Sequence, residues 1–338
     1  MWMIYGANGY TGELIAREAV ARGERPILAG RNAAKLEPLA RELGCEWRAF
    51  ELASPDLRNV SLVLHCAGPF VHTSRPMVDA CLAAGAHYLD ITGEIAVFEA
   101  VFARDADAKA RNVTLLPGVG FDVVPTDCLA AMLHAELPDA NELWLAFFSR
   151  SGVSRGTMKT MIEGAGRGGA IRRDGKIVVV PQMYDVREIA FASGPRTAMT
   201  IPWGDVSTAF RTTGIPNIRV YSAQSRRALA QMRRMQMFLP LLRFAPLRKL
   251  ALRRADKVAG PSAETRETAR VELWGHVANP RGEERTRTMS VSEGYKFTVL
   301  SSLEAVAGVL ANPRAGAFTP AGFFGAEFVT RIPGTARA

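Results

Sequence analysis

The chain has 338 residues, of which 48% are hydrophobic and 22% charged, and its formal net charge is +9. This composition is typical of a globular protein with room for about two domains of roughly 150 residues each, and it argues against a fibrous or disordered chain. The first hydrophobic stretch begins at residue 2 without a basic segment before it. We therefore expect no secretory signal peptide and a cytoplasmic protein.

A glycine-rich motif directly follows this first stretch. Between a predicted strand at 2–5 and a predicted helix at 11–22 stands the run Gly6-Ala7-Asn8-Gly9-Tyr10-Thr11-Gly12. Strand, glycine turn and helix in this order are typical of the phosphate-binding crossover of dinucleotide folds, in which helix N–H groups face the pyrophosphate. Gly6 lets the strand turn sharply, Gly9 lets the backbone approach the phosphates, and Gly12 lets the helix pack closely. We predict that residues 6–12 bind the cofactor.

The second predicted strand, at 26–29, ends next to a cationic residue. Gly30 follows the strand, and Arg31 then occupies the position where NAD-preferring enzymes carry an acidic residue for the ribose 2′-hydroxyl. Arg31 and Lys35 suit a 2′-phosphate instead, with Asn32 between them as a helix cap. We therefore predict NADP(H) as the cofactor, bound in part by Arg31, Asn32 and Lys35. The alternative is that the two cations are solvated surface charges.

Apolar strands alternate with helical patterns as far as about residue 134, which predicts an α/β fold whose N-terminal domain is a Rossmann-type doubly wound parallel sheet. Strands are expected at 2–5, 26–29, 46–50, 60–66, 87–91 and 113–116, and helices at 11–22, 33–43, 74–84, 94–110 and 125–136. The carboxyl ends of such strands share one edge, where the ligand crevice forms.

After about residue 140 the pattern predicts a second, α+β domain built on a mostly antiparallel sheet. Strands are expected at 142–150, 176–180, 187–192, 219–223 and 269–277, with turns at Asp174-Gly175 and at 280–282. We expect 270–277 to pair with 285–291 as a hairpin. Helices are expected at 297–311 and from Pro320 through Phe328, the latter capped by Thr319. The domains are placed at 1–124 and 125–311.

Four residues after the fourth strand are expected to lie beside the cofactor: Ala67, Gly68, Pro69 and Phe70. Small residues let the backbone approach the ribose and nicotinamide, Pro69 fixes the turn, and Phe70 is expected to form an apolar wall. The alternative is a simple turn from strand to loop.

Three residues near the same edge are candidates for acid–base chemistry. Asp122 follows the last parallel strand, and burial against Phe121 would raise its pKa into a useful range, although helix capping is an equally good role. Asp90 ends the fifth strand, and its role stays open. Tyr88 is a further proton-donor candidate, unless strand alternation points it into the core. We expect Glu94 to serve only the dipole of the helix that follows it.

The four cysteines and five histidines are scattered, without a C-x-x-C pair or metal-ligand spacing. We therefore expect buried free thiols, a reducing compartment and no metal site.

One segment accounts for the whole positive charge. Residues 225–257 hold ten Lys or Arg and one acid, so they contribute +9 and the rest of the chain 0. Nucleic-acid-binding proteins more often spread their cations over several elements with aromatic residues between them, so we predict no nucleic-acid partner. The uncharged run at 235–242 is too short to span a bilayer. Three interpretations remain: a helix resting on anionic lipid, a docking surface for an acidic carrier, or an ordinary solvated helix.

Taken together, these motifs resemble the saccharopine dehydrogenase-like family, including its trans-acting enoyl reductase relatives. The matching pieces are 6–12, 30–32, 67–70, 80–94, 118–125 and 319–321. The resemblance implies an NADP-binding Rossmann domain, a second α+β domain over the crevice, a C-terminal segment at about 312–338 that returns to the first domain, hydride chemistry and a homodimer. Amino-acid reductases of the family have a polar residue where this chain has Phe70, which argues against saccharopine as substrate.

Three functions follow. The first is an NADP(H)-dependent oxidoreductase acting on a hydrophobic or acyl-like small molecule, such as an enoyl or keto compound. The second is an imine reductase of the saccharopine type, which needs paired cations for a dicarboxylate substrate. The third is a non-catalytic NADP-binding module that its basic helix attaches to a membrane or protein.

Overall fold

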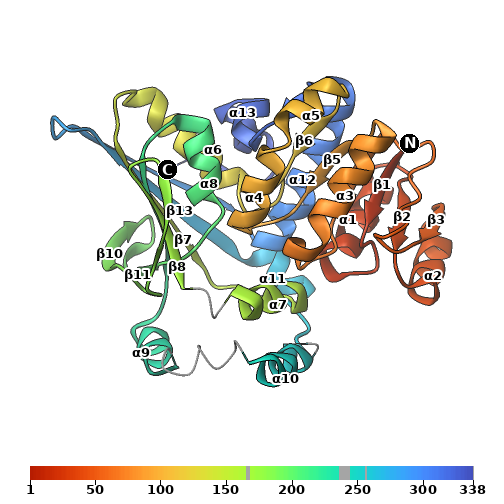
Figure 1. The fold of residues 1–338 in the computed structure, drawn as a ribbon. Helices are drawn as coiled ribbons and strands as arrows, with labels where there is room; N and C mark the ends of the chain where they lie inside the picture. Colours follow the sequence, from red (N-terminus) through yellow and green to blue (C-terminus); the bar gives the residue numbers. More distant parts are fainter. Residues whose placement is uncertain (165–167, 236–243, 256, 338) are drawn as a thin grey trace. The chain divides into compact units, whose positions relative to one another are not determined.

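The computed structural model describes residues 1–164, 168–235, 244–255 and 257–337 (Figure 1). Two compact units make up the chain. The first contains Met1–Val124 and Tyr295–Phe324, and the second contains Pro125–Gly294 and the residues from Gly325 onward. The sequence placed the division after residue 124 and the return of the chain at about 312. In the structure the return begins at Tyr295, and the segment after Phe324 belongs to the second unit.

The first unit is built on a seven-stranded sheet in the order β15-β6-β5-β4-β1-β2-β3, and every neighbouring pair is parallel. The strands are β1 (Trp2–Tyr5), β2 (Ile27–Gly30), β3 (Trp47–Ala49), β4 (Leu62–His65), β5 (His87–Asp90), β6 (Thr114–Leu116) and β15 (Gly316–Ala317). The order 3-2-1-4-5-6 of the first six strands is that of the doubly wound dinucleotide fold. The predicted fold class is confirmed.

The helices of the first unit differ from the expected ones in three places, two of them between residues 70 and 110. They are α1 (Tyr10–Ala21), α2 (Ala33–Leu43), α3 (Phe70–Ala84), α4 (Ile95–Phe102), α5 (Asp105–Ala110), α12 (Gly294–Ala311) and α13 (Pro320–Phe324). The single helix expected at 94–110 is two helices, because the chain turns at Arg104, whose guanidinium binds Asp79 and Asp107. The third helix begins at Phe70 and not at residue 74.

One face of this sheet packs on α3, α4 and α5. Tyr5, Val63 and Tyr88 from the strands share a buried cluster with Met77 of α3 and Phe98 of α4. Because strand side chains alternate between faces, these residues define one side of the sheet.

The second unit is built on a mixed sheet in the order β10-β11-β12-β7-β13-β14-β16, with β8 paired to β12 and β9 paired to β8. Only β7 and β12 run parallel among the recorded pairs, so the sheet is mostly antiparallel, as predicted. The strands are β7 (Glu142–Ser149), β8 (Gly169–Arg173), β9 (Lys176–Val180), β10 (Val186–Phe191), β11 (Gly194–Thr200), β12 (Asn217–Ala223), β13 (Arg270–Ala278), β14 (Glu284–Ser292) and β16 (Ala336–Arg337).

The predicted hairpin is confirmed in its register. Val271 pairs with Val291 and Val277 with Arg285 across β13 and β14. The turn at Asp174-Gly175 joins β8 to β9, and both of its residues have positive φ, at 50° and 73°. Strands β8 and β11 were not predicted, because Gly169, Gly194 and Pro195 stand at their starts.

The helices of the second unit are α6 (Val124–Glu136), α7 (Arg155–Gly164), α8 (Asp205–Thr213), α9 (Arg226–Met235), α10 (Ala245–Ala255), α11 (Ala263–Thr268) and the 3-10 helix η2 (Ala326–Arg331). The last predicted helix, from Pro320 through Phe328, ends at Phe324 because Gly325 takes a φ of +87° and breaks it. Its predicted cap is present, since Thr319 Oγ1 accepts from Gly322 N at 3.0 Å.

The part of the basic segment at 236–243 lies outside the described residues. In the described part, no helix could cross a bilayer.

Candidate functional site

The strand order of the first unit reverses between β1 and β4, where doubly wound folds bind their ligands. The turns that follow these two strands touch each other. A Cβ atom at Gly6 would lie 2.8 Å from the amide nitrogen of Ala67, and Gly6 has a φ of +90°, which only glycine adopts without strain. Its N–H donates to Ala29 O at 2.7 Å, so the loop is tied to β2 as well.

The loop of residues 6–12 brings the start of α1 close to the end of β1. A Cβ atom at Gly12 would lie 2.3 Å from the carbonyl oxygen of Gly6, so a larger residue would push the helix away. Gly9 is the N-cap of α1, and no side chain caps this end of the helix. First-turn N–H groups lack partners within their helix and carry the positive end of its dipole. This arrangement fits a diphosphate.

The cations predicted for the 2′-phosphate lie at the end of β2. Asn32 caps α2 as expected, since its side chain accepts from Lys35 N at 3.2 Å. Arg31 and Lys35 are exposed, and neither makes an ion pair with any residue that the structure describes. Asn8 reaches the same place, because a Cβ at Gly30 would lie 2.8 Å from its Oδ1. These side chains fit a phosphorylated ribose.

Sequence reasoning did not include Tyr295 in the site. Its ring contacts that of Tyr10 edge to face, with centroids 5.1 Å apart and an interplanar angle of 85°. Tyr10 opens α1 and Tyr295 lies in the first turn of α12, so the C-terminal helix of the unit reaches the phosphate loop. No local pattern could have predicted this contact, since the two residues lie far apart in the chain.

The role expected for Phe70 has to be corrected. Its side chain is 8% exposed and belongs to the core cluster, with its ring edge to face against His65 at a centroid distance of 5.4 Å. The ring therefore does not form a wall of the crevice. Gly68, in contrast, is exposed, and Ala67 and Pro69 are half-buried.

His65 lies beneath this turn and is fully buried. Its Nε2 is 3.0 Å from Thr73 Oγ1, and the Thr73 hydroxyl donates to Ala67 O at 2.7 Å. The histidine must therefore donate through Nε2, because the single hydroxyl proton is already used. Burial lowers the pKa of His65 to about 3, so the ring is neutral and supports the turn.

Glu94 has a different role from the expected one. It is the N-cap of α4 by position, but its carboxylate binds the start of α3, accepting from Phe70 N at 2.7 Å and from Val71 N at 3.0 Å. The carboxylate thus satisfies two first-turn amides of another helix and complements its dipole. The sequence could not show this, because it does not reveal which helix ends lie together.

Asp90 and Tyr88 form a buried pair at the end of β5. The Tyr88 hydroxyl donates to Asp90 Oδ2 at 2.6 Å, and both side chains have no exposed area. Asp90 Oδ1 accepts from Thr92 N at 3.0 Å and from Gly118 N at 2.8 Å, which joins the loops after β5 and β6. Tyr88 is therefore a core residue and not an accessible proton donor, and Asp90 positions the two loops.

Replacing Asp90 with asparagine should flatten the pH dependence of stability. Burial raises the pKa of Asp90 to about 6, although its hydrogen bonds oppose the rise, whereas an unfolded aspartate titrates near 4. The folded state binds this proton more tightly. The contribution of Asp90 to stability is therefore fully present below about pH 4 and falls by about 3 kcal/mol as the pH rises through about 6.

Urea denaturation at a series of pH values measures this effect. The free energy of unfolding of Asp90→Asn, relative to the wild type, should rise by about 3 kcal/mol between about pH 4 and pH 8. A difference that stays constant over that range would contradict the assignment.

Asp122 is the acid–base candidate that retains some exposure, since it is half-buried. Its carboxylate lies against the backbone of Gly93, where a Cβ atom would come within 1.7 Å of Oδ2. Helix α12 fixes the loop before it, because Thr298 Oγ1 accepts from Phe121 N at 3.0 Å and the Ser301 hydroxyl donates to Val119 O at 2.7 Å. The structure therefore brings Asp122, Gly93 and α12 together at the carboxyl edge of the sheet.

The four cysteines are free, with Cys81 and Cys128 buried and Cys45 and Cys66 half-buried. Within the described ranges, no group of three or more His, Cys, Asp or Glu side chains could hold a metal ion.

Comparison with known proteins agrees with this geometry. Residues 2–116 match the model of the saccharopine dehydrogenase NADP-binding domain. This part of the chain is therefore similar to the NADP-binding domain of saccharopine dehydrogenases. The matched region ends with β6, and the match supports NADP(H) as the cofactor, as predicted.

Two curated relatives and one solved structure extend this likeness. The trans-acting enoyl reductases of Mycobacterium bovis and Mycobacterium leprae are 30% identical to this chain over 185 and 188 residues, which is 48% of this chain and 43% of each relative. The chain thus spans less than half the length of these relatives. Apo saccharopine dehydrogenase (L-Glu forming) from Saccharomyces cerevisiae shares the fold, with a TM-score of 0.67, 11% identity and coverage of 99% of this chain and 98% of that one.

Proposed function

We propose that this protein is an NADP(H)-dependent oxidoreductase that transfers a hydride between its cofactor and a hydrophobic or acyl-like small molecule, as in enoyl or keto reduction. The observation that carries the proposal is the phosphate loop with the exposed Arg31 and Lys35 at the end of the neighbouring strand. The likeness to trans-acting enoyl reductases over 48% of the chain supports the reaction class.

In this proposal each part of the first unit has one task. The N–H groups at the start of α1 bind the diphosphate, and Arg31 with Lys35 binds the 2′-phosphate and so selects NADP(H) over NAD(H). The backbone of Ala67 and Gly68 lies beside the nicotinamide end. When bound, the cofactor donates or accepts the hydride. Asp122 exchanges a proton with the substrate, because hydride transfer leaves a charge that a proton must neutralise.

The residues of the crevice favour a substrate without paired carboxylates. The stretches 67–70, 91–94 and 117–124, which follow β4, β5 and β6, contain no lysine or arginine. An imine dicarboxylate would need such cations, whereas an enoyl or keto group on an apolar chain would not. This composition supports the acyl-like substrate over the amino-acid imine.

Oxidation of NADPH, followed by its absorbance, tests the proposal. A panel of enoyl thioesters, ketones and imino dicarboxylates separates the three functions considered above. We expect turnover with an enoyl or keto compound and none with the imines. Turnover confined to imines would establish the saccharopine-type reductase instead, and NADPH binding without turnover would establish a non-catalytic module.

Asp122→Asn should lower kcat by about 100-fold and remove the ionisation of the proton donor from the pH–rate profile. Its dissociation constant for NADPH should stay unchanged, because the carboxylate lies at Gly93 and not at the phosphate loop. Steady-state kinetics over a range of pH measures kcat and the pH–rate profile, and titration of the same preparation with NADPH measures the dissociation constant. Full turnover with an unaltered pH profile would exclude Asp122 as the donor.

A further inference from the structure

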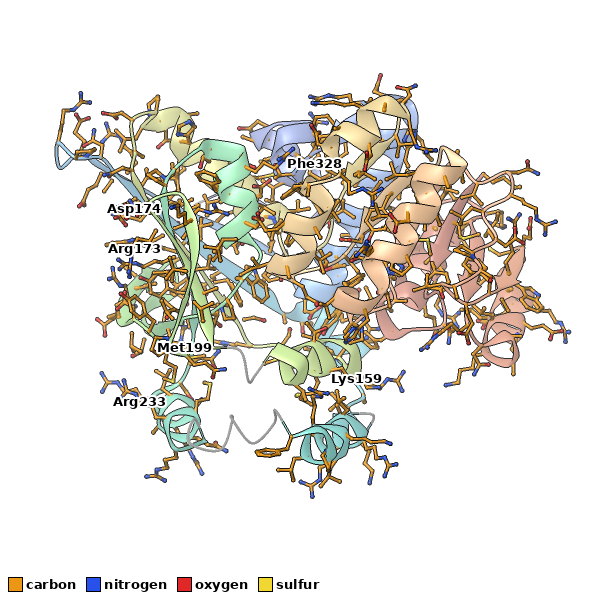
Figure 2. All side chains as sticks on the ribbon, in the orientation of Figure 1. Lys159, Arg173, Asp174, Met199, Arg233 and Phe328 are labelled. Atoms are coloured by element: carbon orange, nitrogen blue, oxygen red, sulfur yellow. The ribbon has the colours of Figure 1, made fainter. Side chains whose placement is uncertain are left out.

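Two helices of the second unit concentrate positive charge without any acidic residue. Helix α9 carries Arg226, Arg227, Arg233 and Arg234, and α10 carries Arg248, Lys249, Arg253 and Arg254. All are exposed except Arg248, which is half-buried. None of these side chains makes an ion pair or hydrogen bond with any of the residues that the structure describes. Figure 2 shows the side chain of the exposed Arg233 extending from α9 away from the rest of the second unit.

Large apolar side chains are exposed on and beside the same helix α10. Phe244, which immediately precedes α10, is 63% exposed, and Leu247 and Leu250 are 44% and 49% exposed. Phe244, Leu247 and Leu250 are spaced three residues apart, so their side chains lie along one side of α10 and of its N-terminal extension. Arg248 and Lys249 flank this side, so cations and apolar groups alternate around the helix surface.

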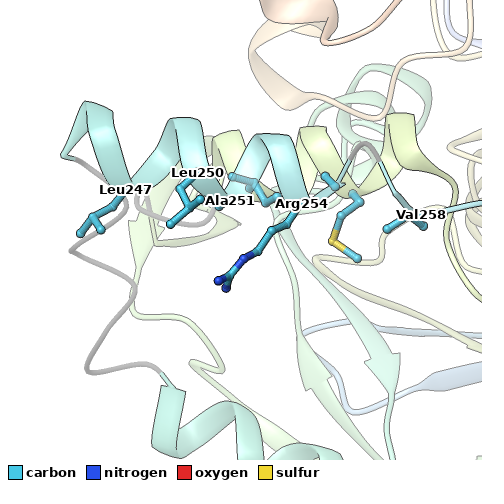
Figure 3. A pocket seen from close by; sticks show the side chains of 8 residues that line it. Leu247, Leu250, Ala251, Arg254 and Val258 are labelled. Atoms are coloured by element: carbon cyan, nitrogen blue, oxygen red, sulfur yellow. The ribbon is translucent and has the colours of Figure 1, made fainter.

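A pocket of about 470 Å³ opens between α10 and α7. Its lining includes Met158 and Ile162 of α7 and Leu247, Leu250 and Ala251 of α10, with Arg254 as the charged member. Figure 3 shows Leu247, Leu250 and Arg254 on one side of α10. The surface thus offers apolar volume next to a guanidinium. An acyl chain joined to an anionic head group has the matching chemistry.

We propose that α7, α9 and α10 form a docking surface for an anionic lipid bilayer. The cations of α9 and α10 contact the phosphate and carboxylate groups of the lipids, and Phe244, Leu247 and Leu250 enter the boundary between head groups and acyl chains. Both α9 and α10 belong to the second unit, and Figure 1 draws them in the lower part of the view. The inference does not depend on the substrate and goes beyond the proposed function.

The exposed apolar side chains favour a bilayer over an acidic carrier protein. The single sign of charge on α9 and α10 would suit either partner, but Phe244, Leu247 and Leu250 among these cations can enter the boundary between head groups and acyl chains. Half-exposed leucines among cations are typical of helices that lie in the plane of a membrane interface. The described helices are too short or too polar to cross it, so the proposed contact is peripheral.

Co-sedimentation of the full chain with vesicles tests this proposal. The vesicles are pure phosphatidylcholine or phosphatidylcholine containing about one-third phosphatidylserine. We expect binding to the anionic vesicles only, and weaker binding when salt rises from about 0.1 M to about 1 M. Lys249→Glu with Arg253→Glu should lower the partition coefficient by at least about 30-fold, since each basic residue near such a surface contributes about 1 kcal/mol.

The matched control changes the net charge equally at other exposed sites of the same unit, with Lys176→Glu and Arg285→Glu. The partition coefficient of this control on the anionic vesicles should stay within about twofold of that of the wild type, because its charge changes act on the vesicles only through a smaller long-range effect. A third variant, Leu247→Gln with Leu250→Gln, should weaken binding by about tenfold, most visibly at high salt, because it removes apolar insertion and no charge.

Three results would overturn the proposal: no binding to the anionic vesicles, equal loss of binding by the two charge-reversal pairs, or salt-sensitive binding of a purified acidic acyl carrier protein with none to vesicles. Thermal unfolding of each variant shows that it is folded. Should the α10 charge reversal lower the melting temperature, Lys249→Gln with Arg253→Gln replaces it, with an expected loss of about 30-fold.

Discussion

Gly12→Ala should lower the affinity for NADPH by at least about 100-fold and also lower the melting temperature. The added methyl group would lie 2.3 Å from the carbonyl oxygen of Gly6 and 2.9 Å from its carbonyl carbon, so backbone and not a flexible side chain must move. Overpacking of this kind costs about 3 kcal/mol, and here the cost falls on the contact between α1 and the phosphate loop. The first-turn N–H groups would then no longer converge on one diphosphate.

Calorimetric titration with NADPH measures the affinity, and differential scanning fluorimetry measures the melting temperature. The matched control is Gly152→Ala, because among the described residues, apart from its chain neighbours, no atom lies within 4 Å of the Cβ position at this exposed glycine in the second unit. The control should bind NADPH like the wild type. Normal NADPH binding by Gly12→Ala would show that the loop does not hold the diphosphate.

Arg31→Ala should weaken NADPH binding by about 10- to 100-fold and leave NADH binding unchanged, because a charge-assisted hydrogen bond is worth about 1.5–3 kcal/mol. Only NADPH carries the 2′-phosphate that the guanidinium would bind. Arg31 is exposed and has no ion-pair partner in the described part of the chain, so its removal leaves no buried charge behind. The cofactor preference should change while the stability does not.

A control in the neighbouring helix separates this effect from a general loss of charge. Arg41 lies in α2, is exposed and pairs with Glu37 at 3.0 Å, so Arg41→Ala should alter neither affinity. Arg31→Lys should recover part of the NADPH affinity, since an ammonium keeps the charge and loses the bidentate fork. Equal weakening of NADPH and NADH by Arg31→Ala would mean that the residue serves the fold and not the 2′-phosphate.

The parts of the fold that sequence predicted correctly have local causes. Gly6 and Gly12 stand where backbone crowding and a positive φ demand glycine, and such demands are visible in the chain itself. Asn32 caps its own helix, and the hairpin of β13 and β14 keeps the expected register. A helix cap or a hairpin register depends on strand alternation and on turn residues that lie within a few positions of each other in the chain.

The parts that sequence could not predict depend on distant neighbours. Phe70 follows β4 and Tyr88 lies within β5, positions at which residues of a binding site are common. The packing of α3 and β5 instead places both side chains in the core. Glu94 caps a helix that begins 24 positions earlier in the chain, and Tyr295 meets Tyr10 through the return of α12. Periodicity describes one element at a time, so it does not tell which helix ends come together.

The central claim is that the start of α1 binds the cofactor diphosphate while Arg31 selects the phosphorylated ribose. Isothermal titration of the purified protein with NADPH and with NADH tests it most directly. We predict heat with NADPH at a micromolar dissociation constant and at least about tenfold weaker binding of NADH. Absence of heat with both nucleotides, or binding of NADH as tight as that of NADPH, would contradict this account.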